Sequence, residues 1–184
     1  MDEQQAIQRL KNGDIGGLEY FVIRYQVKAV RAAFLITRDP GLAEDVVHDA
    51  FIHVYHAISS FDATRPFEPW FMRSVVNASV KMVQRSAREV EVGEDAEETM
   101  LAELARRVES VESQVESIEV QDQIWAALQK LSPRQRAVIV QKYFLGMSEA
   151  EMADQSDAAK GTIKWLLNAA RERLRELLAE RSDR

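Results

Sequence analysis

The sequence predicts an all-α protein with two small helical domains joined by an acidic, partly helical linker. Apolar residues recur at steps of three and four along most of the chain, which is typical of amphipathic helices. Glycine (7) and proline (4), which disfavour helix interiors, are few among the 184 residues. Sustained alternation of apolar and polar residues, the pattern of a half-buried strand, is absent from the sequence.

Charge divides the chain into three parts. Residues 1–88 contain 11 basic and 10 acidic residues, residues 89–122 contain 2 and 12, and residues 123–184 contain 11 and 8. The net charges are therefore +1, −10 and +3, and the middle part carries the acidity behind the total of −6. We expect an N-terminal domain over 1–88, a linker over 89–122 and a C-terminal domain over 123–184. Because charges attract within a Debye length of about 8–10 Å, the acidic total does not exclude a nucleic-acid ligand.

The C-terminal domain has the spacing of a helix-turn-helix. Ser132 is a suitable N-cap, and Pro133 suits the first helical position because its missing N–H is not needed there. Ser148 and Glu151 form a capping box at the start of a second helix. A third helix begins near Lys160 and carries further basic residues. Two short helices followed by a basic one indicate a reader of the DNA major groove.

The clearest helix of the N-terminal domain runs from Asp39 to about Ser59. One of its faces is apolar and is expected to enter the core: Val47, Ala50, Phe51, Val54, Tyr55 and Ile58. Another face is expected to meet solvent or a partner: Asp45, His48, Asp49, Ile52, His53 and His56. A further helix begins near Pro69, and we expect Trp70 to belong to the core.

The linker carries a heptad pattern. Its apolar residues follow alternating steps of three and four: Leu101, Leu104, Val108, Val111, Val115 and Ile118. We expect this helix to pack on one of the two domains, and self-association through the same residues is the less favoured alternative. A further hypothesis is that the helix clamps the free protein in a compact state that does not bind DNA.

Several motifs follow one another in both domains. The N-terminal domain contains Lys11-Asn12-Gly13-Asp14, the run from Ala43 to Phe51, and Phe61 followed by Phe67, Trp70, Phe71, Arg73 and Asn77. The C-terminal domain contains the run from Leu131 to Arg136, Met152-Ala153 and Gly161-Thr162-Ile163-Lys164. In this order they resemble the bacterial RNA polymerase sigma factors of the extracytoplasmic-function (ECF) group. A generic helix-turn-helix regulator would explain only the C-terminal set.

The resemblance implies a transcription initiation factor without an active site or a cofactor. Such proteins bind the clamp coiled coil and flap of core RNA polymerase, direct it to promoter DNA and help to open the duplex. The resemblance also implies a cytoplasmic protein that joins the nucleoid with polymerase and is controlled by an anti-sigma factor or another inhibitory partner. The polymerase-binding residues implied here are Asp45, His48, Asp49 and Ile52.

The resemblance assigns the minus-ten element to the loop between Ser59 and Pro69 and to the helix that follows it. Rings and polar groups of a loop can hold a single-stranded base, while cations follow the phosphates. The implied residues are Phe61, Thr64, Arg65 and Phe67 for the base pocket, and Arg73, Asn77, Lys81 and Arg85 along the strand.

The third C-terminal helix is expected to read the minus-thirty-five element as duplex. Side chains near the start of such a helix reach base edges, while flanking cations bind phosphates. The residues implied are Thr162, Lys164, Trp165, Asn168 and Arg171 on the helix, with Arg134 and Arg136 on the phosphates.

This helix departs from the family's pattern. The family usually has a small polar residue followed by arginine where this chain has Trp165-Leu166, and a buried leucine and a turn glycine where it has Ser156-Asp157. Loss of a bidentate arginine removes roughly 1–3 kcal/mol of discrimination per base pair. Either the minus-thirty-five element is unusual, or the chain is a sigma-like adaptor that binds polymerase or a partner without recognising promoters itself.

A helical metalloprotein is the alternative to a DNA-binding protein. All three histidines, His48, His53 and His56, share a helix face with Asp45 and Asp49. A helical di-metal site needs ligands from several helices, and no second histidine segment exists, so we predict no metal. Phosphate-binding loops, nucleophile elbows and dinucleotide motifs are absent from the sequence, so we predict no enzyme.

The sequence also indicates the cellular compartment. It contains no cysteine for disulfides, and its first residues do not begin a signal peptide. No apolar run is long enough to span a bilayer. These features favour a reducing cytosol.

Overall fold

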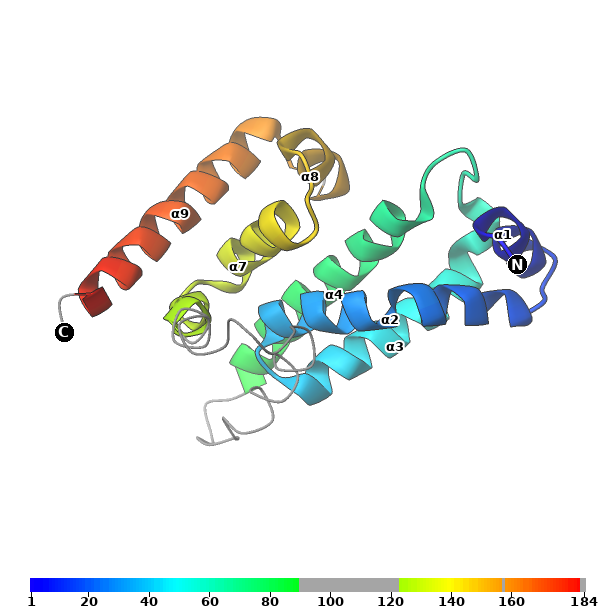
Figure 1. Cartoon of the computed structure of the whole chain (residues 1–184), viewed down its shortest axis with the longest axis horizontal. Coiled ribbons are helices and arrows are strands. Elements are labelled where there is room, and N and C mark those ends of the chain that lie inside the picture. Colours follow the sequence, from blue (N-terminus) through cyan, green and yellow to red (C-terminus); the bar gives the residue numbers. More distant parts are fainter. Residues whose placement is uncertain (90–122, 157, 183–184) are drawn as a thin grey trace, which may run out of the picture.

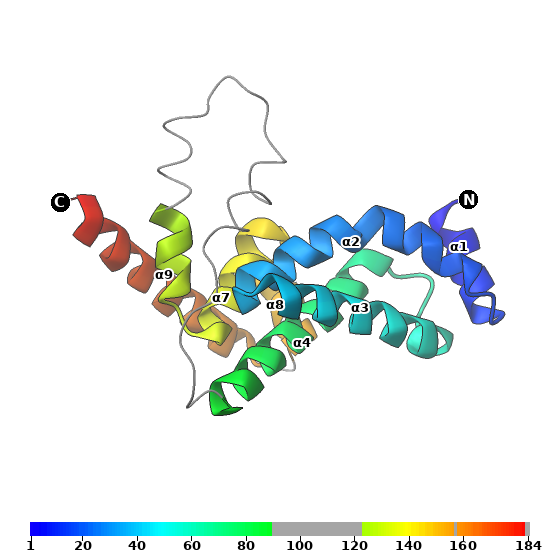
Figure 2. The ribbon, with the colours of Figure 1, turned by 90° about the horizontal axis from the view of Figure 1, so that it is seen from below.

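A computed structural model of the chain describes residues 1–89, 123–156 and 158–182. Every regular element in these ranges is helical, which confirms the predicted all-α class. The N-terminal domain contains α1 (Glu3–Lys11), α2 (Gly16–Thr37), α3 (Pro40–Ala57), a single 3₁₀ turn (Ile58–Ser60) and α4 (Phe67–Glu89). Figures 1 and 2 show α2, α3 and α4 lying alongside one another, with α1 against one end of α2.

Local signals place the helix ends of this domain. Asp39 caps α3 by accepting a hydrogen bond from the Leu42 amide at 2.8 Å, and Pro40 occupies the first turn. Arg38 ends α2 in the left-handed conformation with φ of 64°, and its amide donates to the Phe34 carbonyl at 2.8 Å. The predicted start of α3 is thus confirmed.

Aromatic rings fill the core of the N-terminal domain. The Phe21 and Phe67 ring centroids are 3.9 Å apart, and those of Phe51 and Phe71 are 4.7 Å apart. Trp70 is half-buried with its ring 4.8 Å from Phe61, which confirms its expected place at the core. The apolar face predicted for α3 is confirmed as well, since Val47, Ala50, Phe51, Val54 and Ile58 are buried and Tyr55 packs beside them.

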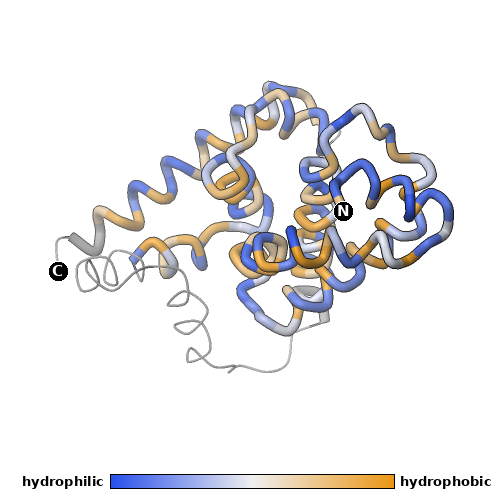
Figure 3. The backbone as a smooth tube through the Cα atoms, turned by 45° about the vertical axis from the view of Figure 1, so that its right-hand side comes forward, coloured by the Kyte–Doolittle hydropathy of each residue, from blue (hydrophilic) through white to orange (hydrophobic). Residues whose placement is uncertain are grey.

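The C-terminal domain starts with a helical stretch over residues 123–129. It continues with α7 (Pro133–Ile139), one π-helical turn (Val140–Phe144), α8 (Glu149–Ser156) and α9 (Lys160–Ser182). Ser132 and Gln135 form a capping box at the start of α7. Hydrophobic and hydrophilic residues follow one another at helical spacing along these helices, as in amphipathic segments (Figure 3). The core of the domain includes Met152, Ile163 and Leu167.

The two domains pack directly against each other. Helix α7 lies between α9 on one side and α2 and α4 on the other (Figure 1). An apolar cluster joins the two halves: Ala32, Ile36, Val76, Ala137 and Val140. The Phe34 and Trp125 rings stack 5.0 Å apart, and the Gln155 side-chain amide donates to the Pro69 carbonyl at 3.0 Å. The heptad helix expected in the linker, with its packing, self-association and clamp role, lies outside the described residues.

The capping box predicted at the start of α8 is confirmed. The Glu151 carboxylate accepts from the Ser148 amide at 2.7 Å, and the Glu151 amide donates to the Ser148 hydroxyl at 3.2 Å. The hydrogen bond from the Ser148 hydroxyl, and then that from its amide, lowers the pKa of Glu151. Stability that arises from this lowered pKa is present above the ordinary value of 4.5 and is lost as the pH falls through the lower folded value.

We expect Ser148→Ala to lower the free energy of unfolding by about 1 kcal/mol at neutral pH, because it removes the cap of α8. The difference from the natural chain should shrink in acid, where Glu151 becomes protonated. Urea unfolding at several pH values measures both effects. Ser156→Ala is the control and should change the free energy of unfolding by less than about 0.5 kcal/mol. The Ser156 hydroxyl donates to the Met152 carbonyl of the same helix and does not cap a helix end. A constant deficit at every pH would contradict the role given to Glu151.

Candidate polymerase and nucleic-acid interfaces

The exposed face of α3 gathers the residues expected to bind polymerase. Asp45, His48, Asp49 and Ile52 follow the helical spacing of one stripe, and all four are exposed. Ile52 keeps 44 % of its surface accessible beside two carboxylates. The opposite face of α3 is fixed in the aromatic core, so this stripe is held rigidly toward solvent. An apolar side chain ringed by charges suits contact with another protein.

The three histidines lie on the exposed side of α3. His48, His53 and His56 are each accessible, and the His56 ring contacts the Tyr55 ring at 5.5 Å. Across the described ranges of the chain, no group of three or more histidine, aspartate and glutamate side chains is arranged to hold a metal ion.

Two of the four residues expected in the base pocket are buried in this conformation. Phe61 and Phe67 are buried in the aromatic core, and neither presents an open face to a base. The Phe61 ring meets Phe67 edge-on at 5.8 Å, while Phe67 also stacks on Phe21. Sequence alone showed aromatic residues near a loop, but it did not show that both rings are needed to fill the core.

The other two pocket residues lie on an exposed and well-anchored loop. The Thr64 amide and hydroxyl both donate to the Asp62 carboxylate, at 3.0 and 2.7 Å. These hydrogen bonds, the hydroxyl first, lower the pKa of Asp62. Arg65 is exposed next to them, with its Nε 3.7 Å from the same carboxylate. The loop therefore holds a hydroxyl and a cation at the surface in a defined turn.

Lys11 helps to position this loop and was not among the expected site residues. Its ammonium donates to the Phe61 carbonyl at 2.7 Å, and the Gln4 amide donates to the Ala63 carbonyl at 3.1 Å. Helix α1 thus braces a loop some fifty residues away in sequence. The Lys11-Asn12-Gly13-Asp14 motif was the available signal, but a motif does not show which distant carbonyl a lysine reaches.

The polar residues expected along α4 share one stripe, because they are spaced four residues apart. Lys81 and Arg85 are exposed, whereas Arg73 and Asn77 are partly buried. Val76 and Val80, which neighbour this stripe, pack against the C-terminal domain. The stripe therefore runs along the edge of the contact between the domains.

The first turns of α9 expose most of the residues expected to read duplex DNA. Thr162, Lys164, Trp165 and Asn168 are exposed, while Ile163 and Leu167 are buried in the domain core. Arg171 is engaged within the domain, because its Nε donates to the Tyr143 hydroxyl at 2.8 Å and its guanidinium lies 5.7 Å from the Tyr143 ring centroid. Ser156 is exposed rather than part of the core, and its hydroxyl donates to the Met152 carbonyl at 2.8 Å.

Arg134 and Arg136 have opposite environments. Arg134 is exposed at the start of α7, as a phosphate contact requires. Arg136 is only 2 % exposed, and its Nε and Nη1 have no hydrogen-bond partner among the described residues, so the side chain is not accessible to a phosphate in this conformation. Burial, and then the nearby charge of Arg38, lowers the pKa of Arg136 to about 10. The side chain therefore remains a charged, unpaired group at neutral pH.

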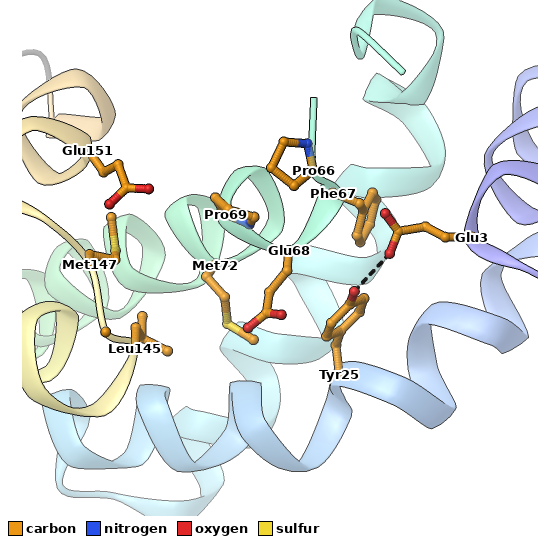
Figure 4. A pocket seen from close by; sticks show the side chains of 11 residues that line it. Glu3, Tyr25, Pro66, Phe67, Glu68, Pro69, Met72, Leu145, Met147 and Glu151 are labelled. Atoms are coloured by element: carbon orange, nitrogen blue, oxygen red, sulfur yellow. Dashed lines mark hydrogen bonds between the residues drawn. The ribbon is translucent and has the colours of Figure 1, made fainter. Parts of the chain in front are cut away.

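A cleft of about 340 Å³ opens between the two domains (Figure 4). Tyr25 and Glu68 line it from the N-terminal domain, and Met147 and Glu151 line it from the C-terminal domain. The Tyr25 hydroxyl donates to the Glu3 carboxylate at 2.9 Å, and burial raises the pKa of Tyr25 to about 12. Glu68 pairs with Lys28. The side chains that line the cleft include the apolar Met72 and Leu145 and the carboxylates of Glu3, Glu68 and Glu151.

Family comparisons match both domains. The family model of Sigma-70 region 2 matches residues 21–89, and that of Sigma-70, region 4 matches residues 121–174. The chain is 28 % identical over 181 residues to the ECF RNA polymerase sigma factor SigW of Bacillus subtilis, covering 96 % of this chain and 97 % of SigW. It is 26 % identical over 178 residues to the ECF RNA polymerase sigma-E factor of Escherichia coli K12, covering 94 % and 92 %.

Solved structures show the same fold. CnrH, solved in complex with the cytosolic domain of CnrY, is 25 % identical and superposes with a TM-score of 0.66 over 97 % of this chain and 99 % of CnrH. RpoE of Bartonella quintana, solved with the anti-sigma factor NepR, is 23 % identical with a TM-score of 0.66, over 88 % of this chain and 96 % of RpoE.

No helix within the described residues is both long and apolar enough to cross a membrane.

Proposed function

We propose that three surfaces of this chain, which belongs to the ECF sigma factors, carry out separate steps of initiation: the α3 face, the 61–66 loop and the recognition helix α9. The chain is a non-enzymatic specificity factor that brings core RNA polymerase to promoters. In the proposal, Asp45, His48, Asp49 and Ile52 bind the polymerase clamp. The observation that supports this most is the rigid, exposed stripe that these four residues form on α3.

The minus-ten element is assigned to the loop and the stripe of α4. Thr64 and Arg65 supply exposed polar groups at the loop. The strand then follows Arg73, Asn77, Lys81 and Arg85, whose spacing places them along one side of α4. Phe61 and Phe67 support the loop from within the core and are not proposed as base-stacking rings.

Promoter binding requires the two domains to separate. The minus-ten and minus-thirty-five elements lie about 25 base pairs apart, or roughly 85 Å at about 3.4 Å per base pair. A compact chain of 184 residues has a radius of gyration of roughly 16 Å, so the packed domains do not reach both elements. The 33 residues from 90 to 122 can span at most roughly 110 Å, which is enough for both contacts.

The packed arrangement also suggests how an inhibitor acts. CnrH, a structural neighbour, was solved with the cytosolic domain of CnrY. We assign to this chain an anti-sigma factor that bridges the two domains near the acidic cleft and keeps them together. The protein would work where promoters are, in the cytoplasm, and would join the nucleoid when bound to polymerase.

The test of the polymerase contact uses two matched substitutions. Ile52→Asp on α3 is expected to weaken binding to core polymerase at least tenfold, because it places a charge at the centre of the interface. Ile23→Asp makes the same change at a residue of α2 that is 76 % exposed, and it should leave binding unchanged. Co-migration with core polymerase, quantified by titration, measures both. Equal affinity for the two variants would contradict the assigned face.

Promoter recognition is tested by run-off transcription on genomic fragments with the reconstituted holoenzyme. Discrete start sites are expected. Failure to bind core polymerase would overturn the proposed function. Binding without discrete start sites would instead identify the adaptor, the second candidate, which the unusual Trp165-Leu166 pair favours.

A further inference from the structure

Trp165 is the most exposed aromatic side chain among the described residues. It lies on the second turn of α9 and keeps 68 % of its surface accessible. The neighbouring Ile163 and Leu167 are buried and fix the helix in the domain core, so the indole is displayed on a rigid support. Leaving so large an apolar ring in water is unfavourable, and a bound partner that covers it would recover that free energy.

The charges around Trp165 indicate an anionic partner. Residues 158–171 contain three basic residues, Lys160, Lys164 and Arg171, and no acidic one. Lys164 and Asn168 are also exposed, and their spacing of four residues places them on one stripe of α9 next to the indole. A positive surface on the first turns of a recognition helix complements the phosphates that border the major groove. Duplex DNA is therefore the occupant that this surface fits.

The side chains available on α9 determine which bases it can read. Arginine would read guanine, but Arg171 is held against Tyr143 by a 2.8 Å hydrogen bond and by its place over the ring. The exposed groups that remain beside Lys164 are the Thr162 hydroxyl, which can contact any base, the Trp165 ring and the Asn168 amide. An asparagine amide pairs with adenine N6 and N7, and an apolar side chain packs on the C5-methyl group of thymine.

We propose that Trp165 and Asn168 read adjacent A·T base pairs within the minus-thirty-five element. The ring covers a thymine methyl group, the amide pairs with an adenine, and Lys164 contacts a phosphate. Residues spaced three apart on a helix have Cβ atoms about 5–6 Å apart, and base pairs stack about 3.4 Å apart, so the two side chains reach neighbouring pairs. This inference rests on the proposed function, because it needs α9 in the major groove.

The experiment uses the full chain with core polymerase. The preferred minus-thirty-five element is first selected from a randomised library, and each thymine in it is then replaced singly by deoxyuridine, which removes only the methyl group. One such replacement should weaken holoenzyme binding about fourfold, the change expected for losing one buried methyl-sized group. Trp165→Ala should bind the thymine and uracil duplexes equally. Ile23→Ala, a control on an exposed residue of α2, should keep the fourfold difference.

Each outcome decides the inference. An element in which no uracil replacement weakens binding, or in which Trp165→Ala keeps the fourfold difference, overturns the thymine readout and leaves the sigma function intact. Selection of only G·C pairs overturns it in the same way. If the holoenzyme selects no element and starts at no discrete site, the proposed function fails together with the inference.

Discussion

Replacing Phe71 with alanine is expected to lower the free energy of unfolding of the N-terminal domain by about 3–5 kcal/mol. The Phe71 side chain is fully buried, and its ring centroid lies 4.7 Å from that of Phe51 and 5.9 Å from that of Phe67. Helices α2, α3 and α4 all supply rings to this cluster. Because rigid rings relax poorly around a void, most of the lost packing is not recovered.

Urea unfolding of the full chain, followed by circular dichroism, measures this loss. Ile23→Ala is the control, because it shortens an apolar side chain at a position that is 76 % exposed. It should change stability by no more than about 0.5 kcal/mol. A Phe71→Ala chain within about 1 kcal/mol of the natural one would show that the aromatic cluster does not hold the domain together.

Replacing Arg136 with leucine is expected to strengthen the contact between the two domains by about 1–4 kcal/mol, a factor of roughly five to nine hundred in the closed-to-open ratio. In the packed arrangement, the guanidinium is buried with two nitrogen atoms unpaired, next to Ala137 of the interface cluster. Its charge therefore opposes closure. Leucine fills similar space without that desolvation cost, and separation of the domains returns the natural arginine to water or to a DNA phosphate.

Energy transfer between dyes on the two domains, followed through a urea titration, measures the change. The urea concentration at which the domains separate should rise in Arg136→Leu. Arg134→Leu makes the same substitution at an exposed neighbour and should leave that concentration unchanged. Val140→Glu, which places a charge in the interface cluster, should lower it. A lower separation midpoint for Arg136→Leu would mean that the arginine stabilises the closed form and would overturn this account.

In both domains the sequence indicated one exposed helix face that is available to a partner. On α3, an N-cap at Asp39 and a strong apolar face left only one stripe for a partner, and the structure exposes that stripe. On α9, Thr162, Lys164, Trp165 and Asn168 are exposed as well, which the predicted contact with DNA requires. Periodicity was sufficient in both cases because it relates residues within one or two turns of the same helix.

Long-range packing decides features that the sequence did not show. Phe61 and Phe67 have the residue types of a base pocket, and both pack with rings of α2 and α4 in the core. Ser156 lies at the surface, although the family has a buried leucine at this position. Each of these outcomes depends on which segments meet in space, and residue type or spacing within one helix does not contain that information.

The sequence by itself determined the helical class, the caps at Asp39, Ser132 and Ser148 and the order of the two domains, because these depend on interactions among residues a few positions apart. Only the tertiary structure decided that α7 packs against α2 and α4, that Tyr143 holds Arg171 and that the buried Nε and Nη1 atoms of Arg136 find no partner among the described residues. The physical reason is that burial depends on contacts between residues distant in the sequence. In the packed arrangement, Arg136 is a buried charge whose Nε and Nη1 atoms find no hydrogen-bond partner among the described residues, and its contact with a DNA phosphate stays a prediction.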